Sequence, residues 1–349
     1  MSEFVWKQDG FSLVMSAPEV YVDNKARKRS GHMSHALAEF AEDCVIDFNS
    51  NCSPFVGNGH LPYGFIEYRI SRDAGVSWGN IHTLPYSVQA IYDGLFTVSV
   101  EKAVAVNHRI VIFCLRNTFR GCEPWRTATW LYSDDEGETW SEARELSGYR
   151  GRIYDARVKD GKIYVLLHCN DAVKAFTGND PEHVYRLYIS EDAGESFKEV
   201  GIVPLPTWNH GYGAIIFRPD GSLIAYSYNV SDEVNIDYVI SYDDGKTWVE
   251  SGICYLDKRI RNPQISLLDG TYILQGRAGT KGFVFYNSAD GVNWSEGLMY
   301  EPNKALCYYS NGIVLNDPEG GKRLLIQYSE VYELNCVNAM HMFIKKVAE

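Results

Sequence analysis

Five copies of one short pattern, Ser-x-Asp-x-Gly-x-x-aromatic, recur along this chain of 349 residues. The copies begin at Ser71, Ser133, Ser190, Ser241 and Ser288, and the last is one residue shorter than the others. Their serines are separated by 62, 57, 51 and 47 residues, and each copy follows an apolar or aromatic run. Such spacing is typical of a fold in which one structural unit of about 50 residues is repeated.

Each part of the pattern suits a tight turn between two strands. The aspartate can accept hydrogen bonds from backbone amides, the glycine permits a positive φ, and the aromatic residue can pack into an adjacent apolar layer. We therefore interpret the pattern as a turn that closes a hairpin, with a structural role and no contact with substrate.

The remaining sequence favours strands throughout. It contains 24 Tyr, 15 Phe and 30 Gly, and its short alternating runs are typical of β-strands separated by turns. Even residues 34–41, which look helical in isolation, lead directly into an apolar run at 44–48, so we predict a strand pair there.

The repeats predict a six-bladed β-propeller of four-stranded antiparallel blades. An interval of about 50 residues suits one such blade. After the fifth turn, strand-like runs at 312–315, 323–328 and 339–344 provide a sixth, and an N-terminal strand at 11–15 would close it. We expect one domain over residues 1–349, with residues 1–30 as the closing segment. Two stacked sandwiches would not explain a turn at every interval.

These turns resemble the Asp-boxes of the sialidase (neuraminidase) superfamily of six-bladed propellers. The resemblance covers essentially residues 30–345. It implies a propeller and a glycan or small acidic sugar as substrate. It does not fix the reaction, because related propellers include other glycosidases, polysaccharide lyases and non-catalytic proteins.

Charge and composition exclude several other classes. With 33 basic and 45 acidic side chains the net charge is −12, which argues against a nucleic-acid partner. No apolar stretch is long enough for a membrane helix and no secretion signal is visible, so we expect no membrane association and a cytoplasmic location. The eight cysteines form no metal-site spacing and no cofactor motif is present, so we expect neither metal nor cofactor. The oligomeric state is not indicated.

A propeller site is expected where the innermost strands converge at one mouth of the central channel. Six polar clusters mark the predicted starts of these strands: 32–35, 92–94, 154–157, 210–212, 261–264 and 308–310.

The last cluster resembles the sialidase ending, in which a tyrosine nucleophile precedes a strand that closes with an acid. By this resemblance Tyr309 would be the nucleophile and Glu330 its positioning residue or base. A phenol is a weak nucleophile and needs a nearby carboxylate to draw off its proton, but it does not repel an anionic substrate.

Arginines are the second feature that the resemblance implies. Arg261 lies in a segment similar to the one that carries a carboxylate-binding arginine in sialidases. A guanidinium binds a carboxylate through two hydrogen bonds, which is why such pockets gather arginines. Further candidates for substrate binding are Arg152, Arg157, Arg277, Tyr212 and Gln264.

The front of the chain departs from the sialidase pattern, because residues 31–37 lack the first arginine and residues 49–70 lack the general-acid aspartate. Histidine could replace them, since it transfers protons near neutral pH. His32, His35, His60 and His210 could face the mouth, and we take His35 and His210 as catalytic candidates. Asp93 is a further catalytic candidate, as an expected innermost-strand carboxylate.

Three functions therefore remain open. The first is a retaining exo-glycosidase of sialidase type that acts on a terminal acidic sugar. The second is a polysaccharide lyase or other glycosidase that uses histidine and tyrosine in the same pocket. The third is a glycan-binding propeller without catalytic activity.

Overall fold

The computed structural model describes residues 4–8, 11–31, 35–53, 64–94, 96–118, 126–169, 183–279, 282–301, 307–333 and 336–348. These residues form twenty-five β-strands and one helix, and every strand pairing among them is antiparallel. The all-β prediction is confirmed. The helix that these residues form is too short to cross a membrane.

Hydrogen bonds divide the strands into five sheets. Three sheets have four strands: β4 (His35–Ala41), β5 (Cys44–Cys52), β6 (Gly64–Ser71) and β7 (His82–Thr83); β15 (His210–Phe217), β16 (Leu223–Asn229), β17 (Asn235–Ser241) and β18 (Glu250–Tyr255); and β19 (Arg261–Leu268), β20 (Thr271–Ala278), β21 (Gly282–Ser288) and β22 (Leu298–Tyr300).

The fourth sheet has seven strands because one long strand belongs to two arrays. Its strands are β8 (Phe96–Val106), β9 (Arg109–Thr118), β10 (Thr127–Ser133), β11 (Arg144–Lys159), β12 (Lys162–Cys169), β13 (Tyr185–Ser190) and β14 (Lys198–Val203). The first part of β11, up to Arg150, pairs with β10, and the part from Gly151 onward pairs with β12.

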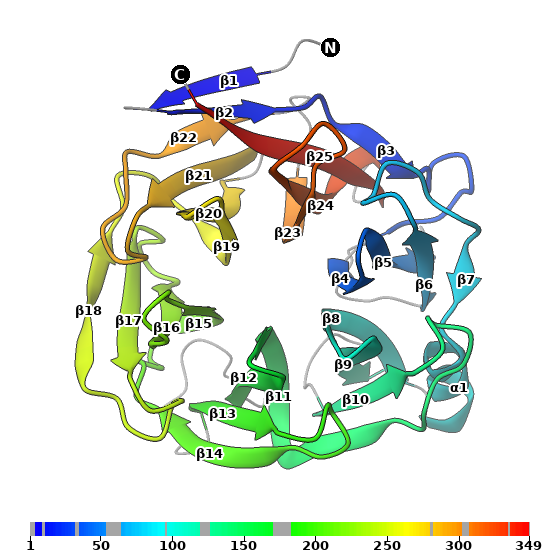
Figure 1. Cartoon of the computed structure of the whole chain (residues 1–349). Helices are drawn as coiled ribbons and strands as arrows, with labels where there is room; N and C mark the ends of the chain where they lie inside the picture. Colours follow the sequence, from blue (N-terminus) through cyan, green and yellow to red (C-terminus); the bar gives the residue numbers. More distant parts are fainter. Residues whose placement is uncertain are drawn as a thin grey trace.

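The fifth sheet joins the two ends of the chain. It contains β1 (Phe4–Gln8), β2 (Phe11–Met15), β3 (Glu19–Val22), β23 (Cys307–Asn316), β24 (Lys322–Glu333) and β25 (Cys336–Ala348). Both β2 and β3 pair with β25, so the predicted closing strand at 11–15 is confirmed (Figure 1). The sheets thus differ from the predicted six separate four-stranded units: β11 fuses two arrays, and the N-terminal strands extend the last one.

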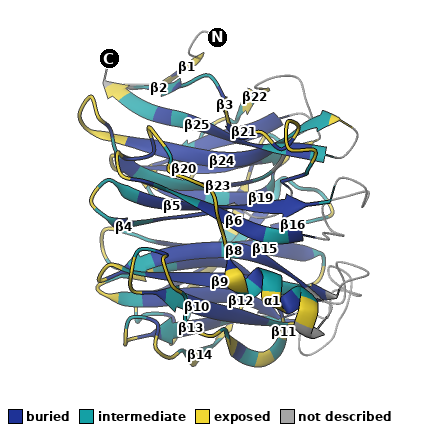
Figure 2. Ribbon diagram, turned by 90° about the vertical axis from the view of Figure 1, so that its right-hand side faces the viewer, coloured by how far each residue is buried: buried dark blue, intermediate teal, exposed yellow. Residues whose placement is uncertain are grey.

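The strands β4, β8, β11, β15, β19 and β23 face the common axis of the sheets (Figure 1). Going around it, β4 contacts β8, β8 contacts β11, β11 contacts β15, β15 contacts β19, β19 contacts β23, and β23 contacts β4. The apolar core lies between neighbouring arrays, as where Ile46 and Phe48 of β5 share one cluster with Val100 of β8. Figure 2 shows buried residues along the strands and exposed ones mainly at the turns.

The five Asp-box turns have the predicted internal bonding. In the second box, Ser133 Oγ donates to Asp135 at 2.8 Å and accepts the N–H of Gly137 at 2.8 Å, and the other boxes repeat these contacts. Gly137 has a φ of 90°, and Glu136 before it is also left-handed at 60°. The structural role of the boxes is confirmed.

The boxes also join neighbouring strand arrays. The Tyr68 hydroxyl of β6 donates to the Gly137 carbonyl at 2.6 Å, and Trp130 Nε1 of β10 donates to that of Gly194 at 3.0 Å. Arg323 of β24 closes the series by donating to the Ala74 carbonyl in the first box at 2.8 Å. The repeated turn is therefore a joint between arrays as well as the end of a hairpin.

Because the box turns contact neighbouring arrays, a glycine-to-alanine substitution in a box should lower stability more than the same substitution in an ordinary turn. Gly137 and Gly161 both have a positive φ, 90° and 75°, so alanine at either costs about 1–2 kcal/mol of left-handed strain. A Cβ at Gly137 would also lie 3.3 Å from Tyr68 Cε2, whereas at Gly161 it would meet nothing within 4 Å. We predict that Gly137→Ala lowers the free energy of unfolding in urea by more than Gly161→Ala does. Equal losses would contradict the inter-array role.

Candidate active site

Five of the axis-facing strands contain a β-bulge at the same level. The register shifts lie between Val100 and Lys102, Ile153 and Asp155, Gly211 and Gly213, Arg261 and Gln264, and Tyr308 and Ser310. A bulge bends the strand and redirects the side chain of the extra residue. The residues redirected here are Glu101, Tyr154, Tyr212, Asn262 and Tyr309.

All five bulge residues line one cavity of about 60 Å³, which we call the small cavity. Its other polar lining residues are Lys102, Arg152, Gln264, Ser310 and Asn311. Three bulge residues have left-handed backbones: φ is 45° at Tyr212, 56° at Asn262 and 29° at Tyr309. Such conformations cost about 1–3 kcal/mol each and are typical of functional sites, where the surrounding fold enforces them.

A buried ion pair forms one wall of the small cavity. The Arg152 guanidinium donates two hydrogen bonds to the Glu101 carboxylate, each 2.8 Å long, and both side chains are buried. Burial alone would lower the pKa of Arg152, but Glu101 and the neighbouring tyrosines raise it above its ordinary value. The guanidinium also lies 5.2 Å from the centre of the Tyr154 ring and 5.4 Å from that of Tyr212.

Tyr309 lies among cations and a second phenol. The Arg277 guanidinium of β20 is 5.9 Å from the centre of its ring, and its hydroxyl is hydrogen-bonded to Tyr212. Burial raises the pKa of Tyr309 well above its ordinary value and Tyr212 raises it further, while Arg152 and Arg277 lower it. A phenolate at this position would face two guanidinium groups.

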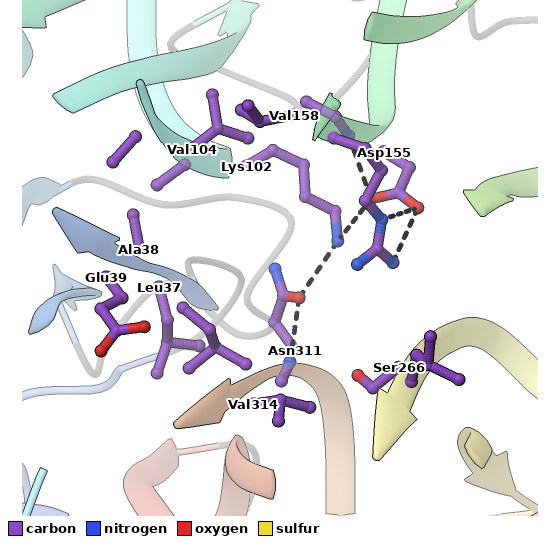
Figure 3. A pocket seen from close by; sticks show the side chains of 17 residues that line it. Leu37, Ala38, Glu39, Lys102, Val104, Asp155, Val158, Ser266, Asn311 and Val314 are labelled. Carbon is purple, nitrogen blue, oxygen red and sulfur yellow. Dashed lines mark hydrogen bonds and ion pairs between the residues drawn. The ribbon is translucent and has the colours of Figure 1, made fainter. Parts of the chain in front are cut away.

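Lys102 closes the floor of the small cavity. Its ammonium lies 3.2 Å from Asp155 Oδ1 and 3.0 Å from Asn311 Oδ1 (Figure 3). It also donates to Gln264. Burial lowers the pKa of Lys102 despite the adjacent Asp155. On the other side of Lys102 lies a large cavity of about 360 Å³ between the later parts of the axis-facing strands.

The structure brings together several residues predicted from the sequence. Tyr309, Arg152, Tyr212 and Gln264 line the small cavity, and Arg277 lies against Tyr309. Each of the five comes from a different strand: β11, β15, β19, β20 or β23. Their catalytic or binding roles remain predictions.

Three other candidates lie outside the lining of the small cavity. Arg157 lines the large cavity and binds Asp155 as well as the carbonyls of Ile215 and Ile265, so the prediction that it shares a pocket with Tyr309 is wrong. Arg261 Nε forms an ion pair with Glu233 at 2.7 Å. Glu330 lies on β24 opposite Cys307 and accepts a hydrogen bond from Tyr328 at 3.4 Å.

His210 is held by two acceptors. Its Nδ1 is 2.6 Å from the Trp208 carbonyl oxygen and its Nε2 is 2.7 Å from Asp237 Oδ2. Burial would lower its pKa, but the bonds to Asp237 and to the Trp208 carbonyl raise it overall. Both ring nitrogens donate only in the imidazolium form, so His210 acts as a clamp between β15 and β17. His32, His60 and the side chain of His35 lie outside the described residues.

The prediction that Asp93 begins an innermost strand is wrong. Residues 92–94 form the last turn of helix α1 (Pro85–Gly94), and the axis-facing strand β8 begins only at Phe96. Helix α1 starts at Pro85, which has no N–H to leave unpaired and whose fixed φ suits a first helical position. Because the helix is short, the sequence pattern did not reveal it.

Among the polar residues of the small cavity, Glu101, Lys102 and Asn311 were not predicted from the sequence. Glu101 and Lys102 interrupt the apolar run of β8 and are both buried, Lys102 at 5% exposure. Adjacent opposite charges within an apolar strand are the signal that could have identified them. In a regular strand, adjacent side chains point to opposite faces, so Glu101 and Lys102 would not both line the cavity. The bulge at Glu101 allows both to line it.

Comparisons with known proteins agree with the turns and the fold. The family described as BNR/Asp-box repeat matches residues 131–142, which contain the second box. A curated protein named sialidase from Paraclostridium sordellii is 30% identical over 134 residues, 34% of this chain and 31% of that protein. The match thus spans about a third of the relative's length.

Two solved structures extend the likeness to nearly the whole chain. A protein of unknown function from Dyadobacter fermentans has a TM-score of 0.74 at 14% identity, over 95% of this chain and 99% of that one. A sialidase from Trypanosoma rangeli has a TM-score of 0.65 at 13% identity, over 90% of this chain and 55% of that one. At these identities the likeness concerns the fold.

The clamp at His210 predicts a pH-dependent stability. Because its pKa is raised in the folded state, its contribution is complete below the unfolded value of about 6.5 and is lost as pH rises through the folded value. We predict that His210→Gln lowers the free energy of unfolding by about 1.5–3 kcal/mol in mild acid, and by less at alkaline pH. Urea titrations across this range measure the gap, and a gap that widens with pH would contradict the assignment.

The buried pair predicts a non-additive response. Glu101→Gln leaves the Arg152 guanidinium without a counter-charge, which typically costs about 3–5 kcal/mol. The double variant Glu101→Gln/Arg152→Met removes that buried charge, and we predict that it is more stable than the single variant. Chemical denaturation of the three proteins tests this, and a double variant less stable than Glu101→Gln would refute it.

Proposed function

Since this chain has the Asp-box fold of the sialidase superfamily, we propose that it is a glycoside hydrolase that releases a terminal sugar from a glycan. One observation supports this above all: five strands each contribute a bulged residue to the small cavity, and Tyr309 is one of them. Its neighbours Arg152 and Arg277 are suited to stabilise a phenolate.

Tyr309 serves as the nucleophile in this proposal. Its hydroxyl gives its proton to water, and the phenolate oxygen attacks the anomeric carbon. The bond to the leaving oxygen breaks, and that oxygen takes a proton from water. The glycosyl-tyrosine that forms is later hydrolysed by water. The two guanidinium groups favour the ionised phenol, against the opposing effects of burial and of Tyr212. Glu101, held by Arg152, is suited to stabilise the positive charge that develops on the sugar ring.

In this proposal the enzyme cleaves glycans at their ends and not in the middle. Lys102 and its three partners close the small cavity from below, so a glycan cannot pass through toward the large cavity. A cavity of about 60 Å³ with a closed floor suits one terminal unit better than the middle of a chain. Arg277 and Arg152 favour an acidic sugar, since guanidinium groups bind carboxylates well.

We also propose that the five hydrogen-bonded sheets correspond to six propeller blades in one domain. Counting β11 as the outer strand of one blade and the inner strand of the next divides the seven-stranded sheet in two. The contacts from β4 around to β23 and back to β4 support this arrangement.

Replacing Tyr309 tests the catalytic proposal. We predict that Tyr309→Phe lowers kcat/KM on the best substrate at least about 1,000-fold, because the nucleophilic oxygen is lost. Its melting temperature should change little, since the residue is half-buried and the substitution removes a single oxygen atom. The assay uses a panel of fluorogenic glycosides that includes sialosides and uronides. Tyr242→Phe, which removes an exposed hydroxyl bound to Glu250, is the matched control and should retain activity.

Other outcomes would overturn the proposal. An active Tyr309→Phe variant would exclude the nucleophile. New ultraviolet absorbance from an unsaturated uronate would indicate a lyase instead. Sugars that bind but are recovered intact after long incubation would indicate a binding protein without catalytic activity.

A further inference from the structure

Asn262 in the small cavity has an unusual combination of burial and missing partners. Its side chain lines the cavity and the residue is only 6% exposed. Neither its Oδ1 nor its Nδ2 has a hydrogen-bond partner among the described residues. Burying an amide in this way costs about 1–3 kcal/mol, so native proteins rarely leave one unpaired without a reason.

The backbone at Asn262 adds to this cost. Its φ of 56° is left-handed, and the next residue is Pro263. A residue before proline is normally extended, because the proline ring crowds its backbone. Two independent penalties thus coincide at one residue that faces the cavity, which is typical of a position kept for binding.

Two further hydroxyl groups in the small cavity share this property. Ser310 Oγ and Tyr154 Oη are buried and have no hydrogen-bond partner among the described residues. Ser310 directly follows Tyr309, and Tyr154 lies beneath the Arg152 guanidinium. The cavity therefore presents three neutral polar groups that each can both donate and accept.

We propose that Asn262, Ser310 and Tyr154 form a subsite that recognises adjacent hydroxyl groups on an uncharged face of the sugar ring. This inference rests on the proposed function. It specifies which residues of the small cavity bind the hydroxyl groups of the sugar and which bind its charged group. A carboxylate only accepts, so it would leave the Asn262 carbonyl oxygen unpaired, and a cation would leave the amide N–H groups unpaired. A hydroxyl group supplies both a donor and an acceptor. The charged part of an acidic sugar then faces Arg277, on the Tyr309 side.

The first test measures sugar binding. Probes are the methyl glycosides of glucose, galactose and mannose, together with glucuronic acid and N-acetylneuraminic acid, titrated calorimetrically into the full chain. We expect Asn262→Gly to weaken binding of the best probe by about 5- to 100-fold, as expected for one lost hydrogen bond to a buried group. Deoxy analogues of that probe locate the contact: removing the recognised hydroxyl should weaken binding to the native protein and not to Asn262→Gly.

The second test measures stability without any ligand. Asn262→Gly removes both the unpaired amide and the left-handed strain, so the melting temperature should rise. An amide with a purely structural role would give a fall. The matched control is Asn107→Gly, at a left-handed φ of 51° in the exposed turn between β8 and β9, which should leave probe affinity unchanged.

The outcomes separate this inference from the glycosidase proposal. Binding that depends on Asn262 without cleavage of any glycoside would overturn the hydrolase and support the subsite. Cleavage that Asn262→Gly leaves unchanged would overturn the subsite and support the hydrolase. If no probe binds, or if the melting temperature of Asn262→Gly falls, the subsite is refuted.

Discussion

Four of the five Asp-box turns present a carbonyl oxygen to a neighbouring strand array. Tyr68, Trp130 and Tyr226 donate to three of these carbonyls, and Arg323 donates to the one in the first box. These hydrogen bonds are directional, whereas the apolar contacts between the same arrays are not. Because the turns fix the arrays relative to one another, the bulges of five different strands can meet at one level. The candidate site therefore depends on turns that do not contribute to it.

The unfavourable backbone conformations of the candidate site lie in the bulges. Left-handed tyrosines and an asparagine before proline are unfavourable in isolation, and the long hydrogen-bonded pairings on either side keep them in place. The ion pair of Arg152 with Glu101 and the contacts of Lys102 are buried in the same region. Such a cavity is organised before any ligand arrives, so little binding free energy would be needed to order it.

Local patterns predicted much of the fold, and long-range pairing accounts for what they missed. The boxes, the strands at 312–315, 323–328 and 339–344, and the closing strand at 11–15 were readable because each depends on a few consecutive residues. Tyr309 and Tyr212 lie in polar clusters that the sequence marks before apolar runs, and the structure places both, with Arg152, in the lining of the small cavity. Glu101 was missed since a bulge depends on the partner strand, and the ion pair of Arg261 with Glu233 joins residues far apart in the sequence.

Pairing of the first strands with the last one sets the order in which the molecule can be completed. During synthesis, β2 and β3 emerge early, but their partner β25 is made after all the other strands. The first box likewise waits for Arg323 on β24. The intermediate arrays can form as they emerge from the ribosome, while the N-terminal strands keep exposed edges until β25 is available. Chaperone dependence should therefore be greatest before β25 has been made, and truncation within β25 should leave a protein whose N-terminal edge aggregates.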